Sequence, residues 1–69
     1  MVNLHHRRLN ERKFEHWTDL PNGHRQYWYD VSGRSGWRAR YIKLVNADEQ
    51  TLQFYQEIYD DRGLFGRAA

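Results

Sequence analysis

The chain contains no cysteine among its 69 residues. This absence excludes disulfide bridges, thiolate zinc sites and a thiol nucleophile, which commonly give very small proteins stability or reactivity. A long apolar run is also missing, since no stretch approaches the roughly 18 residues that a membrane-spanning helix needs. The amino-terminal residues lack the apolar segment of a secretory signal. We therefore expect a cytoplasmic protein that does not enter a membrane.

A strong net charge is lacking as well. Eleven Lys and Arg residues against nine Asp and Glu residues give a formal charge of +2, which neither requires nor excludes a polyanionic partner. The charge is uneven, because residues 1–45 hold nine basic and four acidic side chains, and residues 46–69 hold two basic and five acidic. A chain of this length forms one domain at most. We expect a basic amino-terminal arm at residues 1–12 and a single small β domain at residues 13–69.

Aromatic residues are abundant, at 16% of the chain, and together with Val, Ile and Thr they favour pleated, half-buried strands. They gather in four strand-sized segments at residues 13–20, 24–31, 37–45 and 51–59. Turn-forming residues separate these segments. The pattern predicts an all-β fold, a four-stranded antiparallel meander that is either open or curled into a small open barrel. The chain before it is expected to be a short arm or helix.

The turns predict how the strands align. The Leu20-Pro21-Asn22-Gly23 turn requires a positive φ at Gly23 and places Leu20 opposite His24. In the same way, Val31 is expected opposite Trp37, and Val45 opposite Thr51. The cross-strand pairs that follow are Asp19 with Arg25, Trp17 with Tyr27, Asp30 with Arg38, Tyr27 with Tyr41, and Ile42 with Phe54.

This alignment predicts two sheet faces of different chemistry. One is aliphatic and includes Phe14, Leu20, Ile42, Leu44, Leu52, Phe54 and Ile58, with Trp28, His16, His24, Asp30, Arg38 and Arg40. The other is aromatic and includes Trp17, Tyr27, Tyr29, Val31, Trp37, Ala39, Tyr41, Tyr55 and Tyr59. Two apolar faces cannot both remain in water, because large exposed apolar patches normally mark an interaction site. The aromatic face is therefore expected to be the core of a barrel, a self-pairing interface or a platform for a ligand.

Basic and aromatic side chains interleave in residues 24–45. Single-stranded nucleic acids are bound by bases that stack on aromatic rings while Lys and Arg contact the phosphates. We therefore hypothesise a non-catalytic module for single-stranded RNA or DNA. Its candidate binding residues are Arg25, Tyr27, Tyr29, Arg34, Trp37, Tyr41 and Lys43.

Two alternative functions remain open. The aromatic face also suits a protein interaction or homo-oligomerisation module, and we expect a homodimer because few elements are left to cover the sheet. The third hypothesis is a small metal-independent ribonuclease that uses His16 or His24 with Arg38 and Arg40, although no catalytic motif supports it. A metal site needs three or four converging ligands, so the sequence predicts neither a metal nor a cofactor.

Overall fold

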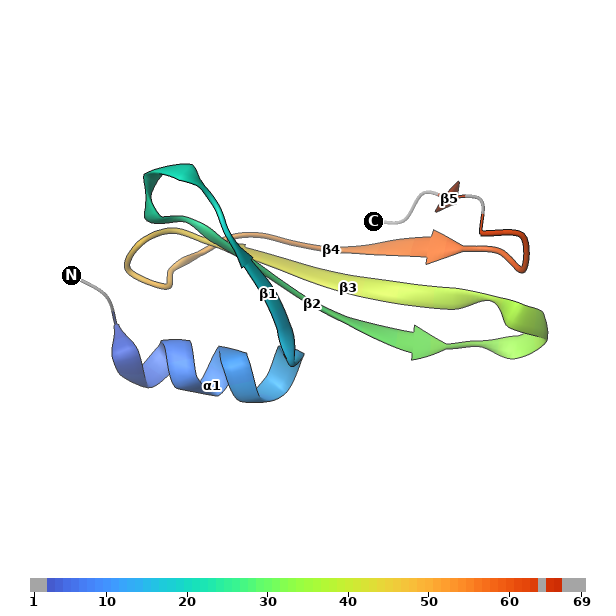
Figure 1. Cartoon of the computed structure of the whole chain (residues 1–69), viewed down its shortest axis with the longest axis horizontal. Coiled ribbons are helices and arrows are strands. Elements are labelled where there is room, and N and C mark those ends of the chain that lie inside the picture. The colour runs from blue at the N-terminus through green and yellow to red at the C-terminus, as the bar shows by residue number, and fades with distance from the viewer. Residues whose placement is uncertain (1–2, 64, 67–69) are drawn as a thin grey trace.

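The computed structural model describes residues 3–63 and the backbone of residues 65–66. Their elements are α1 (Leu4–Phe14), β1 (His16–Asp19), β2 (Arg25–Ser32), β3 (Arg38–Val45), β4 (Thr51–Tyr59) and β5 (Phe65–Gly66), with single 3-10 turns at Pro21–Gly23 and Arg34–Gly36. The strands form one antiparallel sheet in the order β1-β2-β3-β4-β5 (Figure 1). This confirms the predicted meander and the short amino-terminal helix. The sheet stays open, and β5 was not predicted.

The first predicted strand, at residues 13–20, is too long, because its beginning belongs to α1. Asn3 caps this helix by accepting a hydrogen bond from the His6 N–H at 3.1 Å. The helix ends where Glu15 takes a left-handed conformation (φ 70°) and its N–H donates to the Glu11 carbonyl. Phe14 therefore belongs to α1 and not to a strand of the aliphatic face, and its side chain packs against the sheet.

The first hairpin confirms the predicted pairs of Asp19 with Arg25 and Trp17 with Tyr27, and also the positive φ of Gly23. The turn is not the bulged type I turn that Pro21 and Gly23 predict. Asn22 and Gly23 both have positive φ, 66° and 76°, and the His24 N–H donates to the Pro21 carbonyl. These are the features of a type I′ turn, whose twist matches that of paired strands.

We expect Gly23→Ala to lower the free energy of unfolding by about 1 kcal/mol, because a Cβ disfavours this left-handed conformation. The loss should be larger than for Gly63→Ala. The new Cβ at Gly23 would lie 3.1 Å from the Ala47 Cβ, whereas a Cβ at Gly63, with a similar φ of 78°, meets nothing within 4 Å. Urea titration of both variants measures the difference. Adding Ala47→Gly to Gly23→Ala should recover only the part due to contact, and equal losses in the two single variants would contradict the prediction.

The second hairpin is shifted by two residues from the predicted alignment. Val31 pairs with Ala39 rather than Trp37, and Asp30 pairs with Arg40 rather than Arg38. The loop keeps its expected length but lies one residue later, at Gly33 to Trp37, and moving a loop by one residue along the chain shifts the pairing by two. Because side chains alternate between faces, a shift of two leaves every residue on its predicted face.

The predicted alignment of the third hairpin is wrong by one residue over most of its length. Val45 pairs with Thr51 as predicted, but a β-bulge between Leu44 and Val45 places Leu44 opposite Gln53 and Ile42 opposite Tyr55. A shift of one residue exchanges the two faces of β4. The assignments of Phe54 and Ile58 to the aliphatic face, and of Tyr55 and Tyr59 to the aromatic face, are therefore wrong.

We name the two faces by their position relative to α1. The face that α1 contacts is the helix face, formed by Trp17, Arg25, Tyr27, Tyr29, Val31, Ala39, Tyr41, Lys43, Val45, Phe54, Gln56 and Ile58. The opposite face is the open face, formed by His16, Thr18, Gln26, Trp28, Asp30, Arg38, Arg40, Ile42, Leu44, Gln53, Tyr55, Glu57 and Tyr59.

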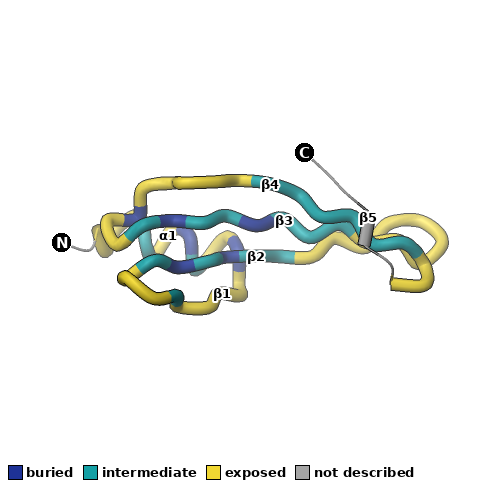
Figure 2. Tube along the Cα trace, turned by 90° about the horizontal axis from the view of Figure 1, so that it is seen from above, coloured by how far each residue is buried: buried dark blue, intermediate teal, exposed yellow. Residues whose placement is uncertain are grey.

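The core lies on the helix face, where Phe14 of α1 packs on Tyr27 and Val45. Figure 1 shows that α1 underlies only the half of the sheet nearer the Pro21–Gly23 turn. The buried residues accordingly concentrate in that half (Figure 2). The other half extends beyond the helix, so the molecule measures 43 × 20 × 17 Å along its principal axes. In the described residues, no helix is long and apolar enough to cross a membrane.

Candidate binding surfaces

Three of the seven predicted binding residues lie under or against α1. Tyr27 is fully buried. Arg25 is also buried and forms ion pairs of 2.7 Å with Glu11 of α1 and Asp19 of β1. Burial opposes its charge, but these hydrogen bonds outweigh that effect and raise the pKa of Arg25. Lys43 donates a hydrogen bond of 3.0 Å to Asn10 of the helix, so all three have structural partners.

Of the other four predicted residues, Tyr29 still packs on Phe14 of α1, whereas Arg34, Trp37 and Tyr41 lie beyond the helix. Tyr29 and Tyr41 pair across β2 and β3 with stacked rings, whose centroids are 5.0 Å apart at 18°. Arg34 and Trp37 are exposed in the connection between these strands. The structure thus brings Tyr29 and Tyr41 together on the helix face and leaves Arg34 and Trp37 in a turn at the far end.

From Phe14 onward, where α1 covers the helix face only in part, the strands carry no charged side chain on this face. We call this part of the helix face the apolar patch, and it consists of Tyr29, Val31, Ala39, Tyr41, Phe54, Gln56 and Ile58. Phe54 is 56% exposed and Val31 is 46% exposed. An apolar surface without charges is more typical of a protein contact than of a phosphate contact.

The open face carries a row of side chains that crosses four strands, with rings on β1, β2 and β4. His16 of β1 stacks on Trp28 of β2 with ring centroids 5.7 Å apart and an interplanar angle of 19°. Next in the row come Ile42 of β3 and Tyr55 of β4. Ile42 is only 2% exposed. Ile42 is thus shielded on a face that no described helix covers, with Trp28 and Tyr55 opposite it on the two neighbouring strands.

Arginine side chains lie among these rings. Arg40 forms a bidentate ion pair with Asp30, at 2.8 and 3.1 Å, and its guanidinium lies 5.8 Å from the Trp28 ring. This hydrogen bond lowers the pKa of Asp30. Arg38 instead lies 4.7 Å above the Tyr59 ring, and in the described part of the chain it forms no ion pair. The predicted Asp30–Arg38 pair is therefore wrong, because Asp30 pairs with Arg40, and the charge of Arg38 only helps to lower the pKa of Asp30.

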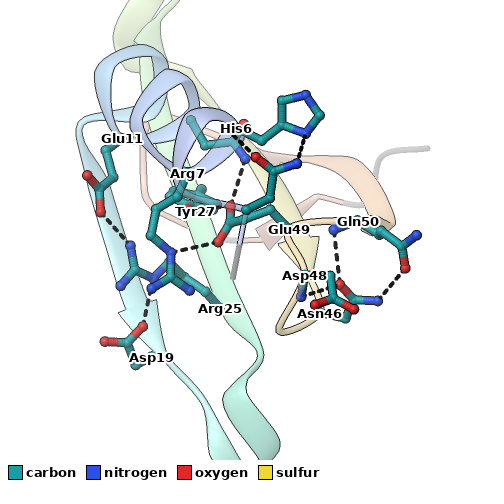
Figure 3. A network of polar contacts seen from close by, with 12 residues as sticks. His6, Arg7, Glu11, Asp19, Arg25, Tyr27, Asn46, Asp48, Glu49 and Gln50 are labelled. Carbon is teal, nitrogen blue, oxygen red and sulfur yellow. Dashed lines mark hydrogen bonds and ion pairs between the residues drawn. The ribbon is translucent and has the colours of Figure 1, made fainter. Parts of the chain in front are cut away.

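A buried carboxylate, missed from the sequence, joins α1 to the sheet (Figure 3). Glu49, in the turn between β3 and β4, accepts hydrogen bonds from Arg7 at 2.9 Å, Asn10 at 3.0 Å and Tyr27 at 2.8 Å. Burial alone would raise the pKa of Glu49, but these donors lower it overall. Burial and the bond to Glu49 together raise the pKa of Tyr27 to about 12. The network explains why the predicted binding residue Tyr27 is enclosed.

His16 and His24, the two histidines of the ribonuclease hypothesis, lie apart in the structure. His16 stacks on Trp28, whereas His24 lies at the turn, and the pairs of Trp17, Thr18 and Asp19 with β2 separate them. No group of three or more His, Asp or Glu residues suited to a metal occurs within residues 3–63.

A groove runs beside α1, where the helix meets the turn between β3 and β4. It is lined by Asn3, His6, Leu9, Asn10, Lys13, Lys43, Asp48, Glu49, Gln50 and Thr51. Asn10, Lys43 and Glu49 hold one another or Tyr27 by hydrogen bonds, so their polar atoms are already used in the fold. This groove is therefore a weaker candidate than the open face.

The chain matches no protein-family model, no curated protein and no solved structure. Its function is therefore inferred from the chemistry of the open face and the apolar patch.

Proposed function

We propose that this protein is a small non-catalytic binding module that holds single-stranded RNA or DNA on its open face. The observation that carries this proposal is the row of rings formed by His16, Trp28 and Tyr55, with Arg38 and Arg40 among the aromatic side chains. Bases stack on such rings whatever their sequence, and a flat antiparallel sheet supports several rings at once. The site differs from the one predicted from the sequence, because α1 occupies much of the helix face.

Stacking would supply most of the affinity. Each base that stacks on an aromatic side chain contributes about 1–3 kcal/mol. Trp28 and Tyr55 lie on either side of Ile42 in the cross-strand row. Two rings separated by one strand lie roughly 10 Å apart, since neighbouring strands are about 4.8 Å apart. A single strand that crosses the sheet would thus contact two rings in turn.

Phosphate contacts would be few, because the charges of the open face are balanced. Asp30 neutralises Arg40, and Glu57 is a second carboxylate on this face. Arg38 lies over the Tyr59 ring and forms no ion pair among the described residues, although its charge acts on Asp30. With about one phosphate contacted, the logarithm of affinity should fall with the logarithm of salt concentration at a slope of roughly −0.7. Binding should therefore be weakly salt-dependent and sequence-tolerant.

Trp28→Ala is expected to weaken binding of a labelled single-stranded oligonucleotide by about 10- to 100-fold, because one stacking surface is lost. The matched control is Trp37→Ala, since Trp37 is an exposed tryptophan that lies outside the row of rings, whereas Trp28 is half-buried. Fluorescence anisotropy at two salt concentrations measures both affinity and salt slope, and far-UV circular dichroism checks the fold. Arg38→Ala removes the one expected phosphate contact, so the salt slope should change from roughly −0.7 to near zero.

Two outcomes count against this proposal. If the wild type does not bind at low salt, the nucleic-acid function is wrong. If Trp37→Ala weakens binding and Trp28→Ala does not, the ligand lies near the turn that holds Arg34 and Trp37, as the sequence suggested.

A second candidate function, a protein-interaction module, is supported by the apolar patch. This surface has no charge to contact phosphates, but its exposed Val31 and Phe54 favour association with another apolar surface. Such binding would be almost independent of salt, and substitutions on the open face would leave it unchanged.

A further inference from the structure

The groove beside α1 has a lysine on each of its two walls. Lys13 comes from the last turn of the helix, and Lys43 comes from β3 of the sheet. Their Nζ atoms lie 5.6 and 5.9 Å from the centroid of the same ring, that of Phe14. At 1.5 Å per residue, Lys13 is about 15 Å along the helix from its cap at Asn3. The two ammonium groups are thus held near one buried ring, at the carboxyl-terminal end of α1.

No carboxylate of the described residues forms an ion pair with these two lysines. Lys43 is half-buried and donates one hydrogen bond, to Asn10. An ammonium group has three N–H donors, so two of Lys43 and those of Lys13 remain free to bind a ligand. Asp48 and Glu49 also line the groove, but Glu49 is held in its buried network and Asp48 is not free either.

An apolar side chain lies beside these donors. Leu9 precedes Lys13 by four residues, so their side chains are neighbours on one side of the helix. Leu9 is 46% exposed and lines the groove, and Thr51 adds a hydroxyl from the sheet side. The groove has a volume of about 930 Å³, which is within the range of small-molecule sites. Its carboxyl-terminal end therefore offers two cations and an apolar wall to one small ligand.

We propose that this end of the groove binds a phosphate monoester with an apolar body. The phosphate lies between Lys13 and Lys43, and the apolar body packs on Leu9. A phosphate monoester carries nearly two negative charges at pH 7, which matches two ammonium groups. Lysine binds such a group as a point charge and requires no fixed bidentate geometry. The site lies on the helix face, opposite the row of rings, so this inference does not rest on the proposed nucleic-acid function.

Phenyl phosphate is a suitable probe because it combines the charged group and the apolar body. We expect saturable binding with a Kd on the order of 1 mM, as is usual for a small ligand in an open groove. Two-dimensional ¹H–¹⁵N NMR should show the largest shifts at Lys13 and Lys43. Inorganic phosphate lacks the body and phenol lacks the charge, so each should bind at least about fivefold more weakly. If phenol binds as tightly as phenyl phosphate, or if phenyl phosphate does not bind, the proposal is wrong.

Lys13→Gln should weaken phenyl phosphate binding by about 2- to 5-fold, the range expected for an exposed ion pair. The double variant Lys13→Gln/Lys43→Gln should weaken it by about tenfold, and glutamine at position 43 can still donate to Asn10. Arg8→Gln/Arg12→Gln is the matched control, because it removes two positive charges from α1 outside the groove. Equal losses in the two double variants would show non-specific attraction only and would overturn the site.

Leu9→Ala tests the apolar wall. It should weaken phenyl phosphate binding by about threefold and leave the binding of inorganic phosphate unchanged, because only the body contacts Leu9. Leu4→Ala is the control, since Leu4 is 58% exposed on the same helix but does not line the groove. Trp28→Ala, which alters the open face, should leave phenyl phosphate binding unchanged. A loss in Trp28→Ala but not in the lysine variants would place the ligand on the open face and refute this site.

Discussion

Replacement of Glu49 by alanine is expected to lower the free energy of unfolding by about 3 kcal/mol, because it leaves buried partners without their acceptor. The carboxylate of Glu49 accepts hydrogen bonds from Arg7, Asn10 and Tyr27, and thereby connects α1, β2 and the turn before β4. Without it, the hydroxyl of Tyr27 stays buried with no acceptor of comparable strength. Urea denaturation followed by tryptophan fluorescence measures the loss.

Glu15→Ala is the matched control for this prediction. Glu15 has a left-handed φ of 70°, close to the 64° of Glu49, but it is exposed and carries no network. Both substitutions replace a glutamate at positive φ by alanine, so backbone strain changes little between them. A loss in Glu49→Ala no larger than in Glu15→Ala would show that the buried network contributes nothing. Glu49→Gly should be less damaging than Glu49→Ala by about 1 kcal/mol, because glycine relieves the strain.

The pH dependence of stability provides a second readout of the same network. The folded-state pKa of Glu49 lies below its ordinary value of about 4.3, so the folded state favours the carboxylate. The resulting stabilisation is fully present above that ordinary value and is lost as the pH falls through the folded pKa. We expect Glu49→Gln to be less stable at pH 7 and to lose less stability than the wild type on acidification. Identical pH profiles would contradict this assignment.

The sequence predicts the strands and their faces correctly where the residues of a turn determine how two strands align. The first hairpin was predicted in register because its turn residues agree with the Asp19–Arg25 and Trp17–Tyr27 pairs. The position of β4 depended on a bulge at Leu44 and Val45, and no residue type there indicates one. One extra residue was enough to exchange Phe54 and Tyr55 between the two faces.

The candidate site depended on a tertiary contact that the sequence hides. The helix α1 is largely polar, and its main contribution to the core is Phe14. Its amphipathic signal was too weak to show which face of the sheet it covers. The sequence does not indicate the burial of Glu49 either, because a glutamate in a turn is normally solvated. From the sequence alone the aromatic face is therefore predicted to bind a ligand, although α1 and Glu49 enclose Tyr27 within it.

The second large effect on stability is expected at Phe14, because the core depends on this one side chain of α1. Phe14 is 1% exposed, and its ring lies 5.7 Å from that of Tyr27 and 5.4 Å from that of Tyr29, measured between centroids. Phe14→Ala should lower the free energy of unfolding by about 4 kcal/mol, through lost burial and the cavity left behind. A chain of 69 residues has a total stability of roughly 3–10 kcal/mol. We therefore expect this variant to be partly or wholly unfolded at room temperature.

Leu9→Ala and Phe14→Leu separate the role of this position from a general effect on α1. Leu9 lies on the same helix but is half exposed, so its truncation should cost less than about 1 kcal/mol. Phe14→Leu keeps an apolar side chain and should retain most of the stability. If Phe14→Ala costs no more than Leu9→Ala in thermal or urea unfolding, α1 is not anchored through this ring. In that event the helix face would be open as well, and Tyr27 and Tyr29 would return as candidates for ligand binding.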